Sequence, residues 1–245
     1  MRLDVALVQV GLCESREEAK ECISKGYVLV DGVVDCKKTR QVEKATHLAI
    51  TQTRKFVSRG GDKLEGALLH VYKTKENARA HLEGKTAIDI GASTGGFTDC
   101  LLSYGVSSVV AVDVGTGQLH TKISSQPNVL SFENTDIRTF RHDVTFDIVV
   151  ADMSFISLEK VASQIYAHSH AESIFFLLIK PQFEVGAGNT KKGIVKDMLL
   201  VQGALEKYRV LFENMGIGNV SIFACNLQGG DGNQEYFLYG KRGIL

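Results

Sequence analysis

The chain has 245 residues, 44% of them hydrophobic, and its 28 basic and 28 acidic side chains leave no formal net charge. This composition is typical of a globular protein, and the length suits one α/β domain of moderate size plus a small appendage. The five cysteines are scattered without a C-x-x-C pair, which argues against zinc and redox motifs and indicates free thiols in a reducing compartment.

Nothing in the sequence indicates export or membrane insertion. Arg2, Asp4 and Gln9 interrupt any apolar core at the start of the chain, so we expect no signal peptide. The longest uninterrupted apolar run, residues 174–179, is far shorter than a membrane span. We therefore expect a cytoplasmic protein with no membrane partner.

Residues 1–50 predict a small α+β module. An amphipathic helix covers residues 1–12, and Ser15 and Glu18 form a capping box for a second helix that stops at Gly26. Residues 27–34 have the pattern of a β-hairpin, and residues 47–50 fit a closing strand. Elements this short bury little surface, so the module should be only marginally stable alone.

This module resembles the RNA-binding domain of ribosomal protein S-four, a fold that also occurs in tyrosyl-tRNA synthetases and pseudouridine synthases. The matching residues are Arg2-Leu3-Asp4, Gly11-Leu12, Ser15-Arg16, Ala19-Lys20, Ile23, Gly26-Tyr27-Val28 and Val30-Asp31-Gly32. The resemblance implies that the side bearing Arg16 and Lys20 binds structured RNA. The residues alone leave open a helix that Glu17, Glu18 and Glu21 merely make soluble.

A basic stretch spans the end of this module and the residues that follow it. Residues 36–65 carry 8 Lys or Arg against 3 Asp or Glu, a net charge of +5. Such a run fits a solvated face or contact with phosphates equally well. The candidate RNA-binding residues are Arg2, Arg16, Lys20, Lys37, Lys38, Arg40, Arg54, Lys55 and Arg59.

Residues 51–62 predict a polar linker between two domains. Its twin glycines, Gly60 and Gly61, permit backbone angles that are closed to other residues. We expect the two domains to change their relative orientation when RNA binds.

The remainder, residues 63–245, predicts a doubly wound, Rossmann-like parallel sheet. Strand-like segments alternate with helical ones at residues 87–90, 108–114, 129–133, 146–151 and 174–179. No helix separates the last two strands, residues 220–225 and 236–239, so the final strand should be antiparallel. A parallel sheet that ends in an antiparallel strand is the shape of S-adenosylmethionine-dependent methyltransferases.

A glycine-rich loop, Gly91-x-x-x-Gly95-Gly96, follows the first of these strands and opens a helix. Glycines let the backbone approach a ligand, and a helix N-terminus offers free N–H groups. Asp113 lies 22 residues after Gly91, about where a ribose-binding carboxylate belongs. The loop lacks the G-x-G-x-x-G pattern, so a plain βα turn and a nicotinamide oxidoreductase are the alternatives.

Four charged residues of this domain lie at the start or end of a predicted helix or strand. Lys63 precedes the first helix, Asp152 and Lys180 each follow a buried strand, and Glu235 enters the last strand. A charge beside a buried strand is costly unless it is paired or functional. A salt-bridge network that closes the sheet edge is the structural alternative.

These motifs together resemble the FtsJ-type ribosomal RNA 2′-O-methyltransferases, and in particular their hemolysin A subgroup, from end to end. The shared motifs are Ser58-Arg59-Gly60-Gly61-x-Lys63-Leu64, Asp89-x-Gly91-Ala92-Ser93-Thr94-Gly95-Gly96-Phe97-Thr98-Asp99, Ala151-Asp152-x-Ser154-Phe155-Ile156-Ser157, Lys180-Pro181-Gln182-Phe183-Glu184 and Gly232-Asn233-x-Glu235-Tyr236-Phe237. Two departures stand out, because Phe97 replaces a tryptophan of related heat-shock methyltransferases and the loop lacks their proline.

The resemblance implies that Lys63, Asp152, Lys180 and Glu235 carry catalysis. It implies S-adenosyl-L-methionine as cofactor, held by Gly91, Ser93, Gly95, Gly96, Phe97, Asp113, Asp136 and Asp152. The implied partner is ribosomal RNA or a ribosomal subunit, and the modified nucleotide and the oligomeric state stay open.

The chemistry accounts for the residue types. A ribose 2′-hydroxyl is a poor nucleophile until its proton is removed, and methyl transfer from a sulfonium needs mainly positioning and help with that proton. Lys180 would act as the base. The nearby ammonium group of Lys63 would favour its neutral amine, because a like charge disfavours the protonated form. Asp152 would place Lys180, and Glu235 would hold Lys63. No metal is required, and His168 and His170 are expected at the surface.

Two other functions remain as alternatives. A secreted or membrane-acting hemolysin would need an export signal and a lytic surface, and neither is evident in the sequence. A catalytically silent RNA-binding or ribosome-assembly factor would have no use for the complete set of two lysines and two carboxylates.

Overall fold

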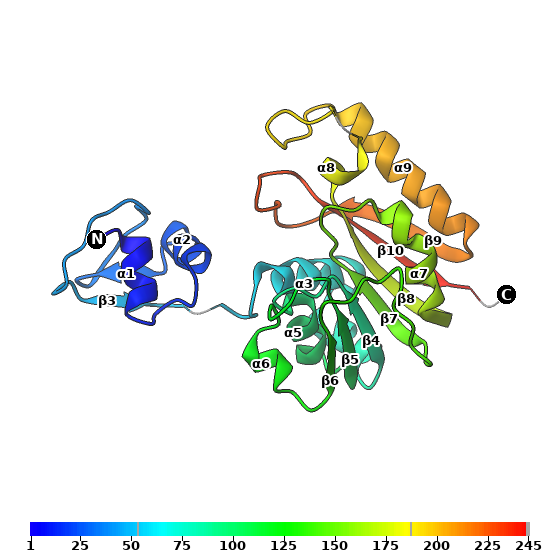
Figure 1. Ribbon diagram of the computed structural model, residues 1–245, viewed down its shortest axis with the longest axis horizontal. Coiled ribbons are helices and arrows are strands. Elements are labelled where there is room, and N and C mark those ends of the chain that lie inside the picture. The colour runs from blue at the N-terminus through cyan, green and yellow to red at the C-terminus, as the bar shows by residue number, and fades with distance from the viewer. Residues whose placement is uncertain (53, 187, 244–245) are drawn as a thin grey trace. The chain divides into compact units, whose positions relative to one another are not determined.

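The computed structural model describes residues 1–52, 54–186 and 188–243. It divides the chain into two compact units, Met1–Arg54 and Lys55–Leu245 (Figure 1). Each unit has a hydrophobic core of its own.

The first unit packs two helices on a three-stranded antiparallel sheet of order β2-β1-β3. Its elements are α1 (Leu3–Gln9), α2 (Arg16–Ser24), β1 (Val28–Val30), β2 (Val33–Val34) and β3 (Leu48–Ile50). The Ser15 side chain accepts a hydrogen bond from Glu18 N at 3.2 Å, as the capping box requires. Leu3, Leu7 and Ile23 are fully buried between the helices and the sheet.

The second unit is built on a seven-stranded sheet of order β6-β5-β4-β7-β8-β10-β9 (Figure 1). Its strands are β4 (Thr86–Ile90), β5 (Ser108–Val112), β6 (Val129–Phe132), β7 (Phe146–Ala151), β8 (Ser169–Ile179), β9 (Ile217–Ala224) and β10 (Tyr236–Arg242). The first five strands are parallel, and β10 lies antiparallel between β8 and β9. The predicted fold class is therefore confirmed.

Helices cover both faces of this sheet. They are α3 (Arg59–Tyr72), α4 (Lys75–Leu82), α5 (Gly96–Ser103), α6 (Thr121–Ser124), η1 (Leu158–Val161), α7 (Ala162–Ala167), α8 (Pro181–Glu184) and α9 (Met198–Asn214). Consecutive strand residues point to opposite faces, so Phe176 packs with α3, α4 and α5, whereas Phe175 packs with α7 and α9. None of the helices among the described residues is both long and apolar enough to cross a membrane.

His168 corrects one prediction from the sequence. It follows α7 and is only 5% exposed, because its ring packs against Phe140 with 5.4 Å between centroids. The expectation of a surface position is wrong for this residue. Burial lowers the pKa of His168, and the neighbouring charges of His142 and Arg141 lower it further.

The twin glycines serve packing rather than backbone freedom. Gly60 and Gly61 lie in the first turn of α3, and neither has a positive φ. A Cβ on Gly61 would overlap the Phe56 side chain, and a Cβ on Gly96 would lie 2.9 Å from Gly61 N. The predicted role in unusual backbone angles is therefore wrong, and helix has replaced the end of the predicted 51–62 linker. The predicted domain limits at residues 50 and 62 stay a prediction.

A matched pair of substitutions tests this packing. We expect Gly61→Ala to lower the free energy of unfolding by about 1–2 kcal/mol, because overpacking outweighs the gain in helix propensity. Gly203→Ala is the control, since Gly203 lies inside α9 with nothing within 4 Å of its Cβ position. That change should stabilise by about 0.5–1 kcal/mol. Equal effects of both changes in chemical denaturation would contradict the packing role.

Candidate active site

The site forms where β4 and β7 end side by side. Ile90 pairs with Ala151, and Asp152 N donates a hydrogen bond to Ile90 O at 3.0 Å. Gly91 follows with φ +80°, and a Cβ there would lie 2.6 Å from the Asp152 carbonyl oxygen. Only glycine fits both the backbone angle and the close approach.

Asp113 joins the glycine loop to the loop that follows β5. Its Oδ2 accepts a hydrogen bond from Ser93 N at 2.8 Å, and its Oδ1 accepts one from Gly115 N at 2.7 Å. Ser93 has φ +48°, a conformation that non-glycine residues rarely adopt without support. Asp113 therefore holds both loops in shape.

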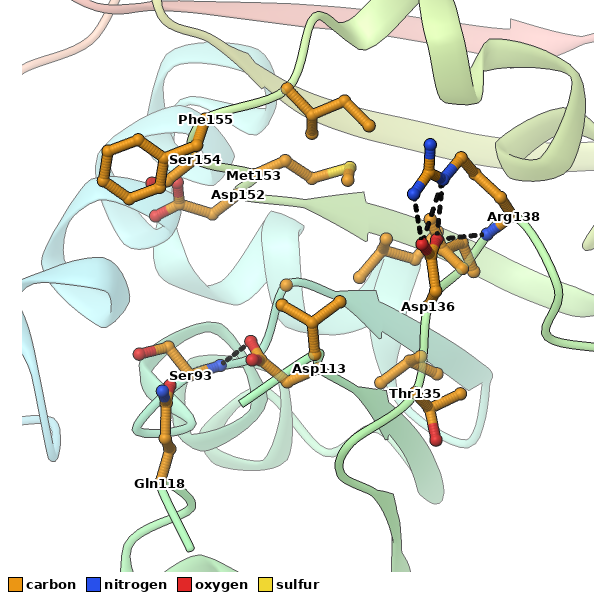
Figure 2. A pocket seen from close by; sticks show the side chains of 16 residues that line it. Ser93, Asp113, Gln118, Thr135, Asp136, Arg138, Asp152, Met153, Ser154 and Phe155 are labelled. Atoms are coloured by element: carbon orange, nitrogen blue, oxygen red, sulfur yellow. Dashed lines mark hydrogen bonds and ion pairs between the residues drawn. The ribbon is translucent and has the colours of Figure 1, made fainter. Parts of the chain in front are cut away.

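A pocket of about 480 Å³ opens beside these loops (Figure 2). Asp113 and Asp136 supply carboxylates at one side, and the segment from Asp152 to Phe155 forms the opposite wall. Arg138 pairs with Asp136 at 2.5 Å, and its hydrogen bonds hold the pKa of that carboxyl below the usual range.

The lining of this pocket fits an adenosyl group. Its apolar surfaces, which include Val112, Ile137 and Met153, suit a flat ring, and carboxylates accept hydrogen bonds from hydroxyl and amino groups. The glycine backbone at Gly91 leaves room for close approach. The volume lies within the range of small-molecule sites.

A smaller pocket of about 240 Å³ continues from the first one toward the end of β8. The two share Gly91, Ser93, Asp152 and Ser154, and the smaller pocket reaches Lys180. Asp152 therefore lines both pockets.

Two ion pairs with buried lysines close this edge of the sheet. Lys180 Nζ lies 2.6 Å from Asp152 Oδ1 and donates a hydrogen bond to Ser154 Oγ at 2.8 Å. Lys63 Nζ lies 2.6 Å from Glu235 Oε2, with both side chains buried. Because Tyr236 pairs with Ile179, Glu235 and Lys180 lie at the same edge. The structure thus places all four residues at one edge of the sheet, and their catalytic role stays a prediction.

The other predicted cofactor residues divide between the two pockets, except that Gly95 lines neither. Gly95 caps α5 with φ +88°, and Gly96 begins the helix. Phe97 is buried and stacks on Phe237 with 6.0 Å between centroids, although it also lines the smaller pocket. Asp136 and Ser93 line the larger pocket.

The predicted RNA-binding residues divide between the two units. Arg2, Arg16, Lys20, Lys37, Lys38, Arg40 and Arg54 belong to the first unit, and Lys55 and Arg59 to the second. Lys37 and Lys38 are exposed, whereas Arg54 is paired with Glu21. Lys55 pairs with Glu65, and Arg59 donates to the Gln228 carbonyl oxygen at 2.5 Å.

A buried network that the sequence did not reveal supports the wall of the site. The Tyr208 hydroxyl bonds to Ser157 Oγ at 2.9 Å and donates to Glu184. Glu184 Oε1 also accepts a hydrogen bond from Leu158 N at 3.1 Å. Tyr208 comes from α9 and Glu184 from α8, so this network ties both helices to the loop that carries Asp152.

Phe155 is another residue that sequence reasoning left without a role. Its side chain is 91% exposed, its φ is +65°, and its ring lies 5.3 Å from that of Phe183. A non-glycine residue in this left-handed conformation costs about 1–3 kcal/mol, and such residues cluster at functional sites.

Comparison with known proteins follows the same division of the chain. Residues 56–242 match the FtsJ-like methyltransferase family, and residues 1–34 match the S4 domain. The chain is 35% identical over 244 residues to Hemolysin A of Brachyspira hyodysenteriae, and the match covers 98% of this chain and 99% of that protein. It is 38% identical over 244 residues to the 16S/23S rRNA (cytidine-2′-O)-methyltransferase TlyA of Mycobacterium tuberculosis, at 97% and 88% coverage.

A solved hemolysin structure from Streptococcus thermophilus has a TM-score of 0.74 at 32% identity, and the match covers 99% of this chain and 88% of that one. Fold and matches together define a methyltransferase with an added S4 domain. The chain belongs to the FtsJ-like methyltransferase family, and its relatives over nearly their full length include Hemolysin A and TlyA. The sequence motifs had predicted this family and its hemolysin A subgroup.

Asp89 provides a pH-dependent test of the site. Burial raises the pKa of its carboxyl to about 7; the hydrogen bond from Thr98 opposes this shift, and the charge of Asp152 adds to it. A raised acid pKa gives a stability contribution that is present at low pH and lost as the pH rises toward 7. Asp89→Asn should therefore gain stability relative to the wild type between about pH 5 and about pH 8, by on the order of 2–4 kcal/mol.

The measurement is the free energy of unfolding across this pH range. Asp143→Asn, at an exposed acid, is the control and should follow the wild-type profile. An Asp89→Asn profile parallel to the wild type would contradict the raised pKa.

Proposed function

We propose that this protein transfers a methyl group from S-adenosylmethionine to a ribose 2′-oxygen of ribosomal RNA, and that its S4 domain binds structured RNA. The observation that carries the proposal is the position of Asp152, which lines the larger pocket and pairs with Lys180. One carboxylate thus joins a nucleotide-sized pocket to an amine that can accept a proton. An RNA substrate of this kind places the reaction in the cytoplasm.

S-Adenosylmethionine supplies a methyl group carried on a positively charged sulfur. Asp113 and Asp136 would accept hydrogen bonds from its hydroxyl and amino groups, and the apolar wall at Val112, Ile137 and Met153 would hold its ring. Asp152 would lie near the positive charge, because this residue lines both pockets.

Lys180 would take the proton from the ribose 2′-hydroxyl. Asp152 and Ser154 fix the position of its Nζ atom. The positively charged sulfur of the cofactor, beside Asp152, would compete with Lys180 for the same carboxylate. Lys63 and Glu235 complete the edge as a buried pair.

Phe155 would help to place the acceptor nucleotide. Its exposed ring follows Ser154 directly and faces solvent at the rim of the pocket (Figure 2). Stacking on aromatic side chains is a common way to hold an unstacked RNA base.

The two alternative functions receive less support. The name Hemolysin A belongs to a relative, and no feature of the described residues favours membrane lysis. A silent assembly factor would not need two buried lysines with carboxylate partners beside a pocket, since ion pairs of this kind contribute little to stability compared with apolar packing.

Asp113→Ala tests the cofactor assignment. We expect it to weaken binding of S-adenosylmethionine about 10- to 100-fold in calorimetry, because hydrogen bonds to a charged group are each worth about 1.5–3 kcal/mol. Asp143→Ala is the control outside the pocket and should bind like the wild type. Binding of NAD by the wild type without binding of S-adenosylmethionine would sink the assignment.

Lys180→Arg tests the chemical step. Arginine keeps the positive charge but cannot give up its proton in a protein, so we expect a decrease of at least about 100-fold in single-turnover methylation of ribosomal subunits. Cofactor binding should remain. Lys241→Arg, a surface lysine paired with Glu172, is the matched control and should keep full activity. A near wild-type rate for Lys180→Arg, with bound RNA verified, would rule out the general-base role.

A further inference from the structure

The first unit contains a buried carboxylate that the predicted RNA-binding set does not include. Asp4 lies in the first turn of α1 and is 0% exposed. Arg2 Nε and Nη2 donate hydrogen bonds to its two oxygens at 2.9 and 3.2 Å. Arg16 Nη2 donates to the same carboxylate at 3.0 Å, from the first turn of α2.

This arrangement fixes two exposed guanidinium groups at one place. The side chains of Arg2 and Arg16 are 43% and 51% exposed. Each arginine donates its hydrogen bonds to Asp4 from one side of the guanidinium group. Neither Nη1 group donates a hydrogen bond within the described part of the chain. The free side of each is therefore available to a ligand.

The surrounding backbone brings a basic segment next to the start of α1. Leu3 N donates to Arg40 O at 2.8 Å, and Arg2 forms a β-bridge with Gln41. Lys37 and Lys38, which precede this contact in the chain, are exposed, whereas Arg40 is paired with Asp35.

The contribution of Asp4 to folding stability does not explain why a carboxylate is buried at this position. Burial raises the pKa of the Asp4 carboxyl, but hydrogen bonds and charges from Arg2 and Arg16 more than offset this, so its pKa lies below the usual range. Asp4 is therefore ionised at neutral pH, at a desolvation cost that an apolar residue would avoid. What an apolar residue cannot do is hold two like-charged groups side by side.

We propose that Asp4 is a positioning residue that orients Arg2 and Arg16 as a paired guanidinium site for a backbone phosphate of structured RNA. The planar guanidinium fork matches phosphate geometry and can bind it with two parallel hydrogen bonds. The carboxylate lowers the repulsion between the two arginines and holds each guanidinium by one side, which leaves the other side for the phosphate. This inference rests on the proposed RNA-binding function of the S4 domain and adds a residue that acts through others.

Asp4→Asn should change the affinity for RNA in opposite directions under two explanations, net charge and orientation of the arginines. Removal of a negative charge should strengthen RNA binding if net charge alone decides affinity. Loss of orientation should instead weaken binding of the full-length chain to purified ribosomal subunits, by about tenfold, or about 1.4 kcal/mol. The slope of log affinity against log salt should also become shallower, by about 0.7–0.9 for each phosphate that the protein no longer neutralises. Glu43→Gln removes one negative charge at an exposed position and is the matched control, which should not weaken binding.

A double-mutant cycle separates orientation from a purely structural role. In the Arg2→Gln, Arg16→Gln background, Asp4→Asn should cause no further decrease of affinity, because the groups through which it acts are gone. A further decrease of similar size there would overturn the proposal. So would an Asp4→Asn variant that binds subunits as tightly as the wild type.

A folding control and a second variant ensure that the test can contradict the proposal. Hydrogen exchange of the α1 and α2 amides reports whether Asp4→Asn leaves the first unit folded. If it does not, Arg16→Lys takes its place, since it keeps the charge but loses the planar fork; it should weaken binding several-fold, and wild-type affinity would overturn the proposal. Failure of the wild-type chain to bind subunits at all would instead overturn the proposed function.

Discussion

The close approach of β4 and β7 is the constraint on which the candidate site depends. Gly91 has φ +80°, and a Cβ at this residue would lie 2.6 Å from the Asp152 carbonyl oxygen. The two strand ends therefore approach each other with no room for a side chain at Gly91. This approach sets the position of the Asp152 carboxylate, which in turn pairs with Lys180. The Asp152 wall of the pocket and the carboxylate partner of Lys180 therefore depend on this backbone contact, and a larger residue at Gly91 would displace the Asp152 segment.

The two ion pairs at this edge make it possible to bury two lysines beside the pocket. Each buried lysine has a carboxylate 2.6 Å away, which offsets the cost of burying either charge alone. Such pairs add little net stability, but they hold an amine at a defined point in a partly dry site. A site of this kind suits a reaction in which positioning and one proton transfer do most of the work.

Sequence reasoning predicted the sheet from patterns that are local in the chain, and it took the roles of the site residues from the resemblance to a known family. Apolar strand segments, the glycine loop and the acids after each strand indicated the order of elements and the edge where they meet, and the hairpin-like ending indicated the antiparallel β10. What it missed depends on interactions between distant residues. Gly60 and Gly61 look like a hinge in the sequence, and only the packing on Phe56 and Gly96 shows their role. Asp4 and Tyr208 likewise acquire partners from other helices, so no spacing rule could have found them.

The most direct test of the account is transfer of labelled methyl groups from S-adenosylmethionine to ribosomal subunits taken from a strain that lacks this protein, followed by mapping of the label. The wild-type chain should place the label on a ribose 2′-oxygen. The Asp152→Asn variant, which keeps the size of the side chain but removes its charge, should lose both most of the transfer and part of the cofactor affinity. Label on a base nitrogen or carbon, or full transfer by the Asp152→Asn variant, would contradict the central role given to this carboxylate.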